Sequence, residues 1–424
     1  MTAQRSPERN AAVGRVIGLD LSKHSAEAAI LEPGAETCKR RRFAAKPAAI
    51  RAFAEKLGAD DRVVLESCTN AFAFHRLLCQ HAGQVVVSNP LKTRIIAEAK
   101  VKTDKVDAEI LARLLAADFL PPVWVPDALT DQLRHVVSHR QGLVRQRTQV
   151  KNRIHAILLR NLLTVEVTDL FGNAGRAFLA KVELPAPERL LLEADLRSLD
   201  FLEAEVTAAE QALAKLVYED EQIRRLLTIP GIALTSAAGL KAAIGDVRRF
   251  RAPANLVSYF GLNPSVYQTG MKAYSGHITH QGRAHARAVC VEAAQLLVRV
   301  PGPFHAFFLR LRRRKSYGVA ITAVARKLTV LVWHMLTKNE DYRYSSPTLT
   351  RQKTNRLHRL ATGNAPPKTS RQPRAQPRHQ SAQEAEADYE AFLRERFGPG
   401  GPPVTEHPIR QTTRTKAPKS RNGA

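Results

Sequence analysis

The chain has 424 residues, and its 65 Lys and Arg against 39 Asp and Glu leave a formal charge of +26. An apolar content of 44% is enough to build hydrophobic cores and excludes a wholly disordered chain. The length predicts two or three domains at ~150 residues each. So cationic a chain favours a polyanionic partner, most commonly nucleic acid, although a basic surface can also serve solubility alone.

Secretion and membrane insertion are not indicated. The most apolar late stretch, 319–336, is interrupted by Arg326 and Lys327, so we expect no membrane span. The first residues contain no apolar segment of the kind found in secretory signals. The cysteines lie far apart, without a Cys-x-x-Cys pair, at Cys38, Cys68, Cys79 and Cys290. Neither a disulfide framework nor a structural zinc site is therefore encoded, and a reduced, cytoplasmic location fits best.

Residues 15–124 alternate the patterns of strands and helices. Short apolar or alternating runs predict strands at 16–21, 26–31, 37–44, 63–65 and 85–87. Pro47 is expected to open an amphipathic helix, and Asn70 to cap another that continues through Leu78. A third helix is predicted over 105–119. Its expected inner face consists of Val106, Ile110, Leu114 and Leu115. Three antiparallel strands followed by alternating helices and strands predict an α/β domain of the ribonuclease-H type.

One long helix is predicted over 129–163. Apolar residues recur along it every seven positions, at Val136, Leu143, Val150 and Ile157. Arg140 and Arg147 take alternating seam positions, which suits a polar or nucleic-acid partner better than a dry coiled coil. The flanks carry further basic residues, namely Arg134, Arg145, Lys151, Arg153 and Arg160. We expect this helix to bind nucleic acid, through Arg140, Arg147 and Lys151 in particular.

A second long helix is predicted after Pro185 and Pro187. Its apolar residues also recur every seven positions, at Leu192, Leu199, Val206 and Leu213, with acidic flanks. This pattern predicts a coiled-coil helix that pairs either with the preceding helix or with another subunit. Pro230 is expected to end it.

The segment 229–336 opens with Ile229-Pro230-Gly231-Ile232. Such a turn between helices either presents backbone N–H groups to a phosphate or simply connects the helices. A polar, Gly-rich loop is predicted over 263–282, and helices over 285–300 and 319–336. From Ser345 onwards prolines are frequent and apolar residues few, so we expect disorder there. The amphipathic patch 389–393 within it is either a docking segment or residual helix.

Four carboxylates in the first region form a pattern of their own. Asp20 ends the first predicted strand, and Glu66 follows a neighbouring buried strand. Asp104 and Asp107 stand three residues apart at the start of a helix, on nearly one face. Each alone has an ordinary explanation, such as a turn cap, a surface residue or a favourable charge at a helix N-terminus. Four converging acids, however, repel one another unless cations neutralise them. Two Mg²⁺ ions, or Mn²⁺ in their place, are a common solution in phosphodiester exchange.

Several short motifs extend this pattern. The first region contains Gly18–Lys23, Leu65–Ser67, Asn89-Pro90 and Lys102–Ala108. The fourth contains Ile229–Ile232, Tyr259–Pro264 and Gly276–Gly282, followed by Arg283 and Arg287. In this order the motifs resemble the DEDD transposases of bacterial insertion sequences. These are the RNA-guided bridge recombinases, relatives of the Piv-type pilin-gene invertases. The likeness covers residues 15–336.

The resemblance implies a role for each matching residue. The four metal-binding acids of the family's RuvC-like domain match Asp20, Glu66, Asp104 and Asp107. The family's serine nucleophile falls at Thr269, whose extra methyl group restricts χ1 and crowds in-line attack. Three interpretations are open: Thr269 is the nucleophile, Ser265 or Ser275 replaces it, or this copy is impaired.

The resemblance also implies the reaction and its partners. These are cleavage and rejoining of double-stranded DNA through a covalent intermediate, a noncoding guide RNA, and a homodimer or homotetramer at the bacterial nucleoid. Arg283 and Arg287 either neutralise the phosphate under attack or clamp the backbone. A hydrolytic junction nuclease and an inactive nucleic-acid-binding relative are the alternatives. The implied parts are a flexible N-terminus (1–14), a RuvC-like DEDD catalytic domain (15–126), a helical coiled-coil region (127–226), a C-terminal transposase domain (227–344) and a basic disordered tail (345–424).

Overall fold

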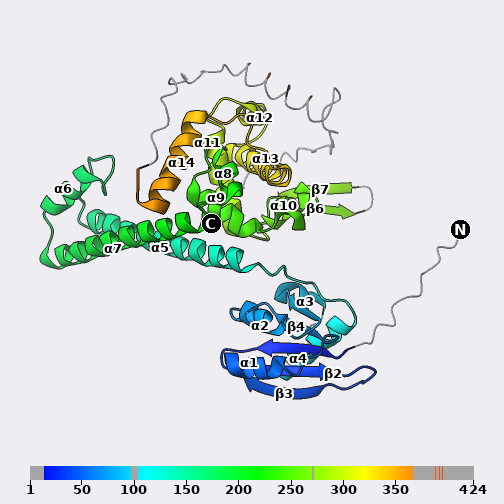
Figure 1. Cartoon of the computed structure of the whole chain (residues 1–424). Helices are drawn as coiled ribbons and strands as arrows, with labels where there is room; N and C mark the ends of the chain where they lie inside the picture. Colours follow the sequence, from blue (N-terminus) through cyan, green and yellow to red (C-terminus); the bar gives the residue numbers. More distant parts are fainter. Residues whose placement is uncertain are drawn as a thin grey trace, which may run out of the picture. The chain divides into compact units, whose positions relative to one another are not determined.

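The computed structural model of the chain describes residues 14–96, 104–269 and 272–365, together with Ala387, Ala391 and Arg394. The chain divides into two compact units, Met1–Pro126 and Asp127–Ala424. The first is an α/β unit. In its described residues the second is helical apart from one β-hairpin (Figure 1).

The first unit is built on a five-stranded sheet in the order β3-β2-β1-β4-β5. β1 (Val16–Leu21), β2 (Ser25–Leu31) and β3 (Lys39–Ala44) are antiparallel neighbours. β4 (Arg62–Glu66) pairs parallel to β1, and β5 (Gln84–Ser88) parallel to β4. This mixed sheet is consistent with the ribonuclease-H type that the order of elements predicts.

Helices cover this sheet on its two faces (Figure 1). α1 (Pro47–Ala54) and α2 (Ala71–Leu78) lie on one face, where Phe53 and Phe74 join the apolar side chains of the central strands in one core. Pro47 occupies the first turn of α1 as predicted, where its missing N–H costs nothing. The short helix α3 (Pro90–Ile96) follows β5.

The opposite face is covered by α4 (Asp104–Ala116). Its buried residues are Ala108, Leu111, Ala112 and Leu115. The predicted inner face was therefore largely wrong, because Val106, Ile110 and Leu114 are only partly buried. Gly18 is the reason. A Cβ at this position would lie 2.0 Å from the carbonyl oxygen of Ala108, so the helix backbone rests directly on the strand and turns its alanines inwards.

The two long helices of the second unit pack against each other as a hairpin. α5 (Ala128–Arg160) and α7 (Ala186–Val217) are its arms, and α6 (Asn173–Lys181) lies in the connection (Figure 1). All four predicted heptad residues of α7 are buried, namely Leu192, Leu199, Val206 and Leu213. The first three share a core with Leu143, Val150 and Ile154 of α5. Of the two predicted pairings, the one with the preceding helix of the same chain is therefore observed.

α7 ends at Val217, well before Pro230. Asp220 accepts hydrogen bonds from the backbone N–H groups of Gln222 and Ile223, at 2.8 and 3.2 Å, and so caps a new helix, α8 (Glu221–Leu227). The prediction that Pro230 ends α7 was therefore wrong, since an aspartate cap had already started another helix.

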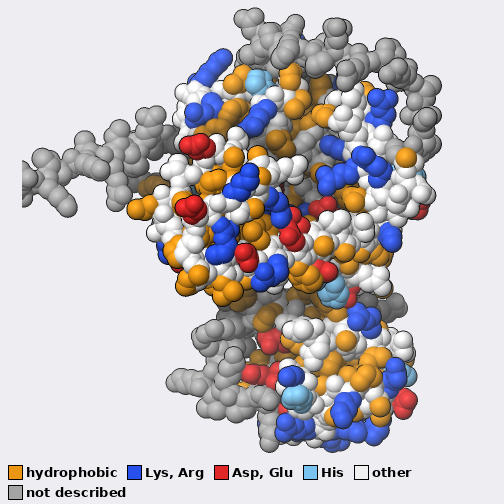
Figure 2. Space-filling model, turned by 90° about the vertical axis from the view of Figure 1, so that its left-hand side faces the viewer, with side chains coloured by type: hydrophobic (Ala, Val, Ile, Leu, Met, Phe, Trp, Pro, Cys, Tyr) orange, Lys and Arg blue, Asp and Glu red, His pale blue; other side chains and the backbone are white. Residues whose placement is uncertain are grey.

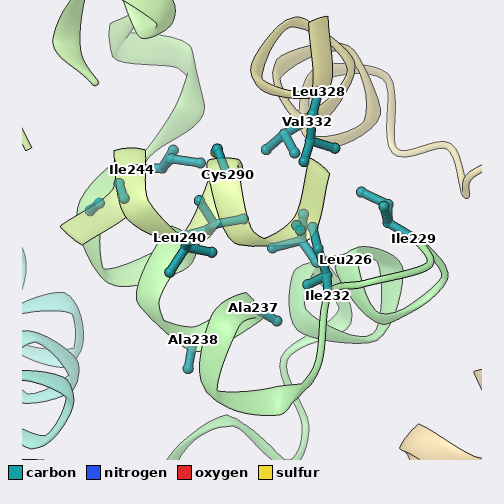
Figure 3. Close-up of a cluster of buried hydrophobic side chains, with 14 of the residues drawn as sticks. Leu226, Ile229, Ile232, Ala237, Ala238, Leu240, Ile244, Cys290, Leu328 and Val332 are labelled. Carbon is teal, nitrogen blue, oxygen red and sulfur yellow. The ribbon is translucent and has the colours of Figure 1, made fainter. Parts of the chain in front are cut away.

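The Pro230-Gly231 turn connects α8 to α9 (Leu234–Ile244) and is packed inside the unit. Ile229 and Ile232 lie in its core beside Leu226 (Figure 3). A Cβ on Gly231 would lie 2.8 Å from the carbonyl oxygen of Ala293. This packing favours a connecting turn over a phosphate-binding one.

Further helices complete the second unit: η1 (Val247–Arg249), α10 (Pro253–Tyr259), α11 (Ala284–Leu297), α12 (Pro303–Arg312), α13 (Tyr317–Lys338) and α14 (Pro347–Thr362). By length and composition α13 would be able to cross a membrane, but 50% of its most apolar window is buried within the unit. Leu328 and Val332 of this helix belong to the core (Figure 3), so α13 has the surroundings of a core helix.

The disorder predicted from Ser345 does not begin there, because α14 occupies 347–362. Ser346 caps the helix, and Leu357 is buried. Lys353 anchors it, since its Nζ donates to the carbonyl oxygens of Leu227 and Ile229 at 2.9 and 2.6 Å. Although the segment has few apolar residues, the burial of Leu357 and the hydrogen bonds of Lys353 are enough to dock this short helix. The prediction of disorder was therefore wrong for residues 347–362. The patch 389–393 lies, apart from Ala391, outside the described residues.

Candidate active site

Asp20 and Glu66 lie side by side at the carboxyl ends of two neighbouring strands. β1 and β4 are parallel, and their last paired residues are Leu19 and Leu65, so the two acids follow directly on this pair. Side chains alternate between the faces of a strand. Asp20 and Glu66 therefore point, like Gly18, to the face that α4 covers. The sheet thus brings together two of the four predicted acids.

The strand register extends this pair into a row across the sheet. Glu27 of β2 is paired with Asp20, and Ser88 of β5 is paired with Glu66. Glu27 is only 9% exposed and forms an ion pair with Arg42 of β3, with 3.3 Å between Oε1 and Nε. We did not single out Glu27 from the sequence. The sequence did contain one indication: Glu27 is a charged residue within an apolar strand, and such a residue is rarely buried unless it has a partner.

α4 brings its first turn to the same end of the sheet. Gly18 meets the helix at Ala108, whereas Val16, earlier on β1, clusters with Leu115. Residues nearer to Asp20 on β1 therefore contact residues nearer to the N-terminus of α4. The helix is also held from the side, because Arg40 of β3 donates to Glu109 at 3.1 Å.

Asp104 and Asp107 lie in this first turn. Asp107 is partly buried, while the side chain of Asp104 lies outside the described part. Among the side chains that are described, no three His, Cys, Asp or Glu are grouped as one metal site. Asp20, Glu66 and Asp107 offer carboxylate oxygens, however, and these are the ligands that fit Mg²⁺ or Mn²⁺.

Asn70 links the ends of β1 and β4. Its Nδ2 donates to the carbonyl oxygen of Ser22 just beyond β1, at 3.2 Å, and its Oδ1 accepts from Cys68 Sγ just beyond β4, at 3.0 Å. Asn70 occupies the N-cap position of α2 as predicted, but its side chain makes this bridge and no cap bond. Partial burial raises the pKa of the Cys68 thiol, and the nearby charges of Glu66 and Asp20 raise it further. The bridge therefore lies against the two carboxylates.

Thr269, the predicted nucleophile, is the last residue of β6 (Pro264–Thr269). This strand pairs antiparallel with β7 (Lys272–Ile278) in a hairpin. The prediction of a loop over 263–282 was wrong here, because β-branched and aromatic residues along both arms favour strands. Thr269 is exposed, so a substrate can reach its hydroxyl.

The alternative hydroxyls differ from Thr269. Ser265 donates to the carbonyl oxygen of His277 at 3.2 Å. Its Oγ also lies 2.4 Å from the place that a Cβ on Gly276 would take, so this hydroxyl is packed into the base of the hairpin. The side chain of Ser275 lies outside the described part. Of the two hydroxyls that are described, that of Thr269 is the more accessible.

Arg287 clamps the backbone, the second of its predicted roles. Its Nη1 donates to the carbonyl oxygens of Phe260 and His280, at 3.1 and 3.0 Å. These bonds tie the start of α11 to the segments on both sides of the β6–β7 hairpin. Arg287 therefore holds the base of the hairpin in place.

Arg283 is exposed at the start of α11, and its Nε donates to the Tyr259 hydroxyl at 2.8 Å. Burial by itself would raise the pKa of Tyr259. The charges and hydrogen bonds of Arg283 and Arg249 outweigh this effect and lower the pKa below its ordinary value. A local excess of positive charge therefore surrounds Tyr259.

The basic residues of α5 are mostly paired with acids of α7. The pairs are Arg140–Glu210 at 2.6 Å, Lys151–Glu203 at 3.7 Å, Arg153–Asp195 at 2.6 Å and Arg160–Glu188 at 2.8 Å. On the face drawn in Figure 2, basic and acidic side chains are interspersed over the larger unit. Arg140 and Lys151 thus act within the hairpin, whereas Arg147 makes no ion pair with a described residue.

Two family models match consecutive parts of the chain. Residues 17–161 match a family model described as "Transposase", and residues 223–309 match one described as "Transposase IS116/IS110/IS902 family". The first match contains the four acids, and the second contains Thr269.

Curated relatives extend over most of both chains. A "Probable family 20 transposase" of Pseudomonas aeruginosa is 27% identical over 77% of this chain and 98% of its own length. The transposase for insertion sequence element IS1328 of Yersinia enterocolitica is 27% identical over 76% and 97%. The pilin gene-inverting protein of Moraxella bovis is 26% identical over 62% and 75%. The two matched models together span more than half of the chain in consecutive order, and the chain belongs to the IS116/IS110/IS902 family of transposases.

Proposed function

We propose that this chain is a recombinase that moves an insertion sequence by cutting and rejoining DNA strands. One observation carries the proposal: Asp20 and Glu66 lie side by side at the end of two parallel strands, where α4 presents its first turn. An edge of a sheet that gathers carboxylates in this way suits divalent cations and, through them, phosphate groups. Relatives named as transposases point the same way.

The metal ligands in this proposal are Asp20, Glu66, Asp104 and Asp107. They would hold Mg²⁺, or Mn²⁺ in its place, most simply as two ions that when bound stabilise charge on the scissile phosphate and on the leaving oxygen. The sheet and the Asn70 bridge fix the first two carboxylates. Glu27 is left out of the set because Arg42 already compensates its charge.

Thr269 supplies the nucleophile in the second unit. Its Oγ loses a proton to solvent and attacks phosphorus, so that a threonine–phosphate bond forms while the P–O bond of the strand breaks and the leaving oxygen takes up a proton. The hydroxyl of another strand end then attacks the same phosphorus, joins the strands and releases Thr269. The number of phosphodiester bonds is unchanged, so no nucleotide cofactor is required. We assign to Arg283, which is exposed at the start of α11, the role of neutralising the phosphate.

The carboxylates and Thr269 belong to different units of the chain. We propose that they meet across subunits in a homodimer or homotetramer, with an element-encoded RNA selecting the target. The heptad seam of α7 is buried against α5 of its own chain, so it does not provide the subunit contact that its sequence suggests.

The nucleophile is tested with DNA carrying the ends of the element. With Mg²⁺, the wild-type protein and Thr269→Ser are expected to yield rejoined product and a protein–DNA adduct on denaturing gels, with the adduct mapping to the peptide that contains residue 269. Thr269→Ala is expected to yield neither. Rejoined product from Thr269→Ala would refute the role of this hydroxyl. Cleaved ends without any adduct from the wild type would instead favour the hydrolytic nuclease.

A further inference from the structure

Two exposed tyrosines lie on one face of the β6–β7 hairpin. Tyr267 and Tyr274 are register partners and are 70% and 61% exposed. Side chains of directly paired residues point to the same face, with Cβ atoms ~5 Å apart. Within the described part of the chain neither ring has a hydrogen-bonding or aromatic partner. Figure 1 shows the hairpin extending away from the helices of its own unit, which is consistent with the exposure of both rings.

Thr269 belongs to the same face of the hairpin. It lies two residues beyond Tyr267 on β6, so its side chain points to the same side, about 7 Å further along the strand. Val266 and Gln268 point to the other side. The ring pair is therefore adjacent to the hydroxyl to which we assign the attack on phosphorus.

The sequence around the hairpin is nearly free of acids. Between Asp246 and Glu340 the only acidic residue is Glu292, against fifteen Lys and Arg. Ion pairs with acids of α7 compensate several basic residues of α5, whereas this segment contains almost no acids of its own. A surface of this charge attracts a polyanion, and exposed aromatic rings on it are typical of sites that bind unpaired bases.

We propose that Tyr267 and Tyr274 form a stacking platform for an unpaired base of the DNA strand that is being cut, next to Thr269. The inference rests on the proposed function for the identity of this strand as DNA. Duplex phosphates require only cations, and the faces of paired bases are covered by their neighbours. An exposed ring pair therefore gains energy only from a base that has left the stack. Holding that nucleotide fixes the neighbouring phosphate in front of the threonine hydroxyl.

The test is equilibrium binding by the full-length protein in EDTA, where no strand is cut. Three probes of one sequence are compared: single-stranded DNA containing 2-aminopurine, single-stranded RNA and duplex DNA. Tyr267→Ala and Tyr274→Ala are each expected to weaken binding of single-stranded DNA by about 5- to 100-fold. They should also abolish the quenching of 2-aminopurine that stacking produces. Tyr267→Phe and Tyr274→Phe keep the ring and are expected to bind like the wild type.

Val266→Ala is the matched control, since Val266 is 61% exposed on the same strand but points to the other face. Unfolding curves that match the wild type establish that the variants fold. Unchanged binding of single-stranded DNA by both alanine variants would overturn the proposal. So would equal losses on duplex DNA, a loss confined to RNA, or a change in oligomeric state, which would assign the rings to a protein contact. Thr269→Ala is expected to bind single-stranded DNA normally. The binding assay therefore tests the tyrosine platform, whereas the assay of rejoined product and protein–DNA adduct tests the role of the Thr269 hydroxyl.

Discussion

Gly18 lies so close to Ala108 that a Cβ on the glycine would come within 2.0 Å of the alanine carbonyl oxygen. A glycine is needed at this position because no side chain fits between β1 and the backbone of α4. Because it precedes Asp20 by two residues on the same face of β1, this contact decides how closely the first turn of α4 approaches the carboxylates.

Gly18→Ala is expected to push α4 away from the sheet. Overpacking of this kind costs about 1–3 kcal/mol of unfolding free energy. DNA cleavage should also fall, because Asp107 moves away from Asp20. Urea denaturation and a cleavage assay measure the two effects. Gly142→Ala in α5 is the control: it has open space around it and should gain up to about 1 kcal/mol. Wild-type stability and activity in Gly18→Ala would contradict the proposed packing.

Asn70→Ala removes the bridge between the ends of β1 and β4. We expect a fall in Mn²⁺ affinity of about 10-fold, the lower end of the range for residues that orient metal ligands, with a loss of only about 1 kcal/mol in stability. Asn161→Ala is the matched control, since it removes a similar bond, 2.9 Å long, from an asparagine Nδ2 to the carbonyl oxygen of Ile157 in α5. Equal Mn²⁺ affinity in the wild type and Asn70→Ala would show that the bridge does not position the carboxylates.

Glu210 accepts from Arg140 of α5 at 2.6 Å and from Arg356 of α14 at 3.2 Å, and its side chain is 13% exposed. Glu210→Gln is expected to destabilise the protein by about 1–3 kcal/mol, because two charge-assisted hydrogen bonds are weakened. DNA affinity should not fall. Thermal unfolding and DNA binding at several salt concentrations check both statements.

Arg147 provides the contrasting case on the same helix. Arg147→Ala is expected to leave stability nearly unchanged. It should also make the slope of log DNA affinity against log salt concentration shallower, by the amount that about one phosphate contact contributes. If Arg140→Ala weakened DNA binding as much as Arg147→Ala does, the assignment of Arg140 to the hairpin would be wrong.

Lys353 makes stability depend on pH in the alkaline range. Burial lowers its pKa from 10.5 to about 8, although two backbone carbonyls accept from its ammonium group. Between pH 8 and 10.5 the unfolded chain keeps a proton that the folded chain releases, so the free energy of unfolding rises with pH across this window. Lys353→Met lacks this contribution. The difference in unfolding free energy, wild type minus variant, should therefore grow from pH 8 to 10 and be flat below pH 7. Parallel pH profiles would contradict the lowered pKa.

Much of the fold follows from local patterns. Strands such as β1 and β4 are short apolar runs, and the heptads of α7 predict its buried face because periodicity reports burial directly. Other features depend on tertiary contacts that one sequence does not display. The inner face of α4 is set by the space above Gly18, the side chain of Asn70 bridges two strands in place of a cap, and α14 forms because Lys353 and Leu357 find partners more than a hundred residues away.

The candidate site likewise combines residues that local patterns predict with residues that only tertiary contacts reveal. Asp20 and Glu66 were predictable because both stand where buried strands end, and parallel strands end at one edge. Glu27 and Tyr274 were missed, since only the strand register places one beside Asp20 and the other beside Tyr267. The ion pairs of Arg140, Lys151, Arg153 and Arg160 on α5 could not be predicted, because their acidic partners lie on another helix.

Mn²⁺ binding, followed by electron paramagnetic resonance of the full-length protein, tests the central claim most directly. The wild type is expected to bind Mn²⁺, and Asp20→Asn and Glu66→Gln to lose at least about 10-fold in affinity while they still bind DNA. Glu55→Gln makes the same change of charge at the end of α1, away from the site, and should bind Mn²⁺ like the wild type. EDTA should abolish DNA cleavage by the wild type. Undiminished Mn²⁺ binding by both Asp20→Asn and Glu66→Gln would contradict a metal site built on these carboxylates.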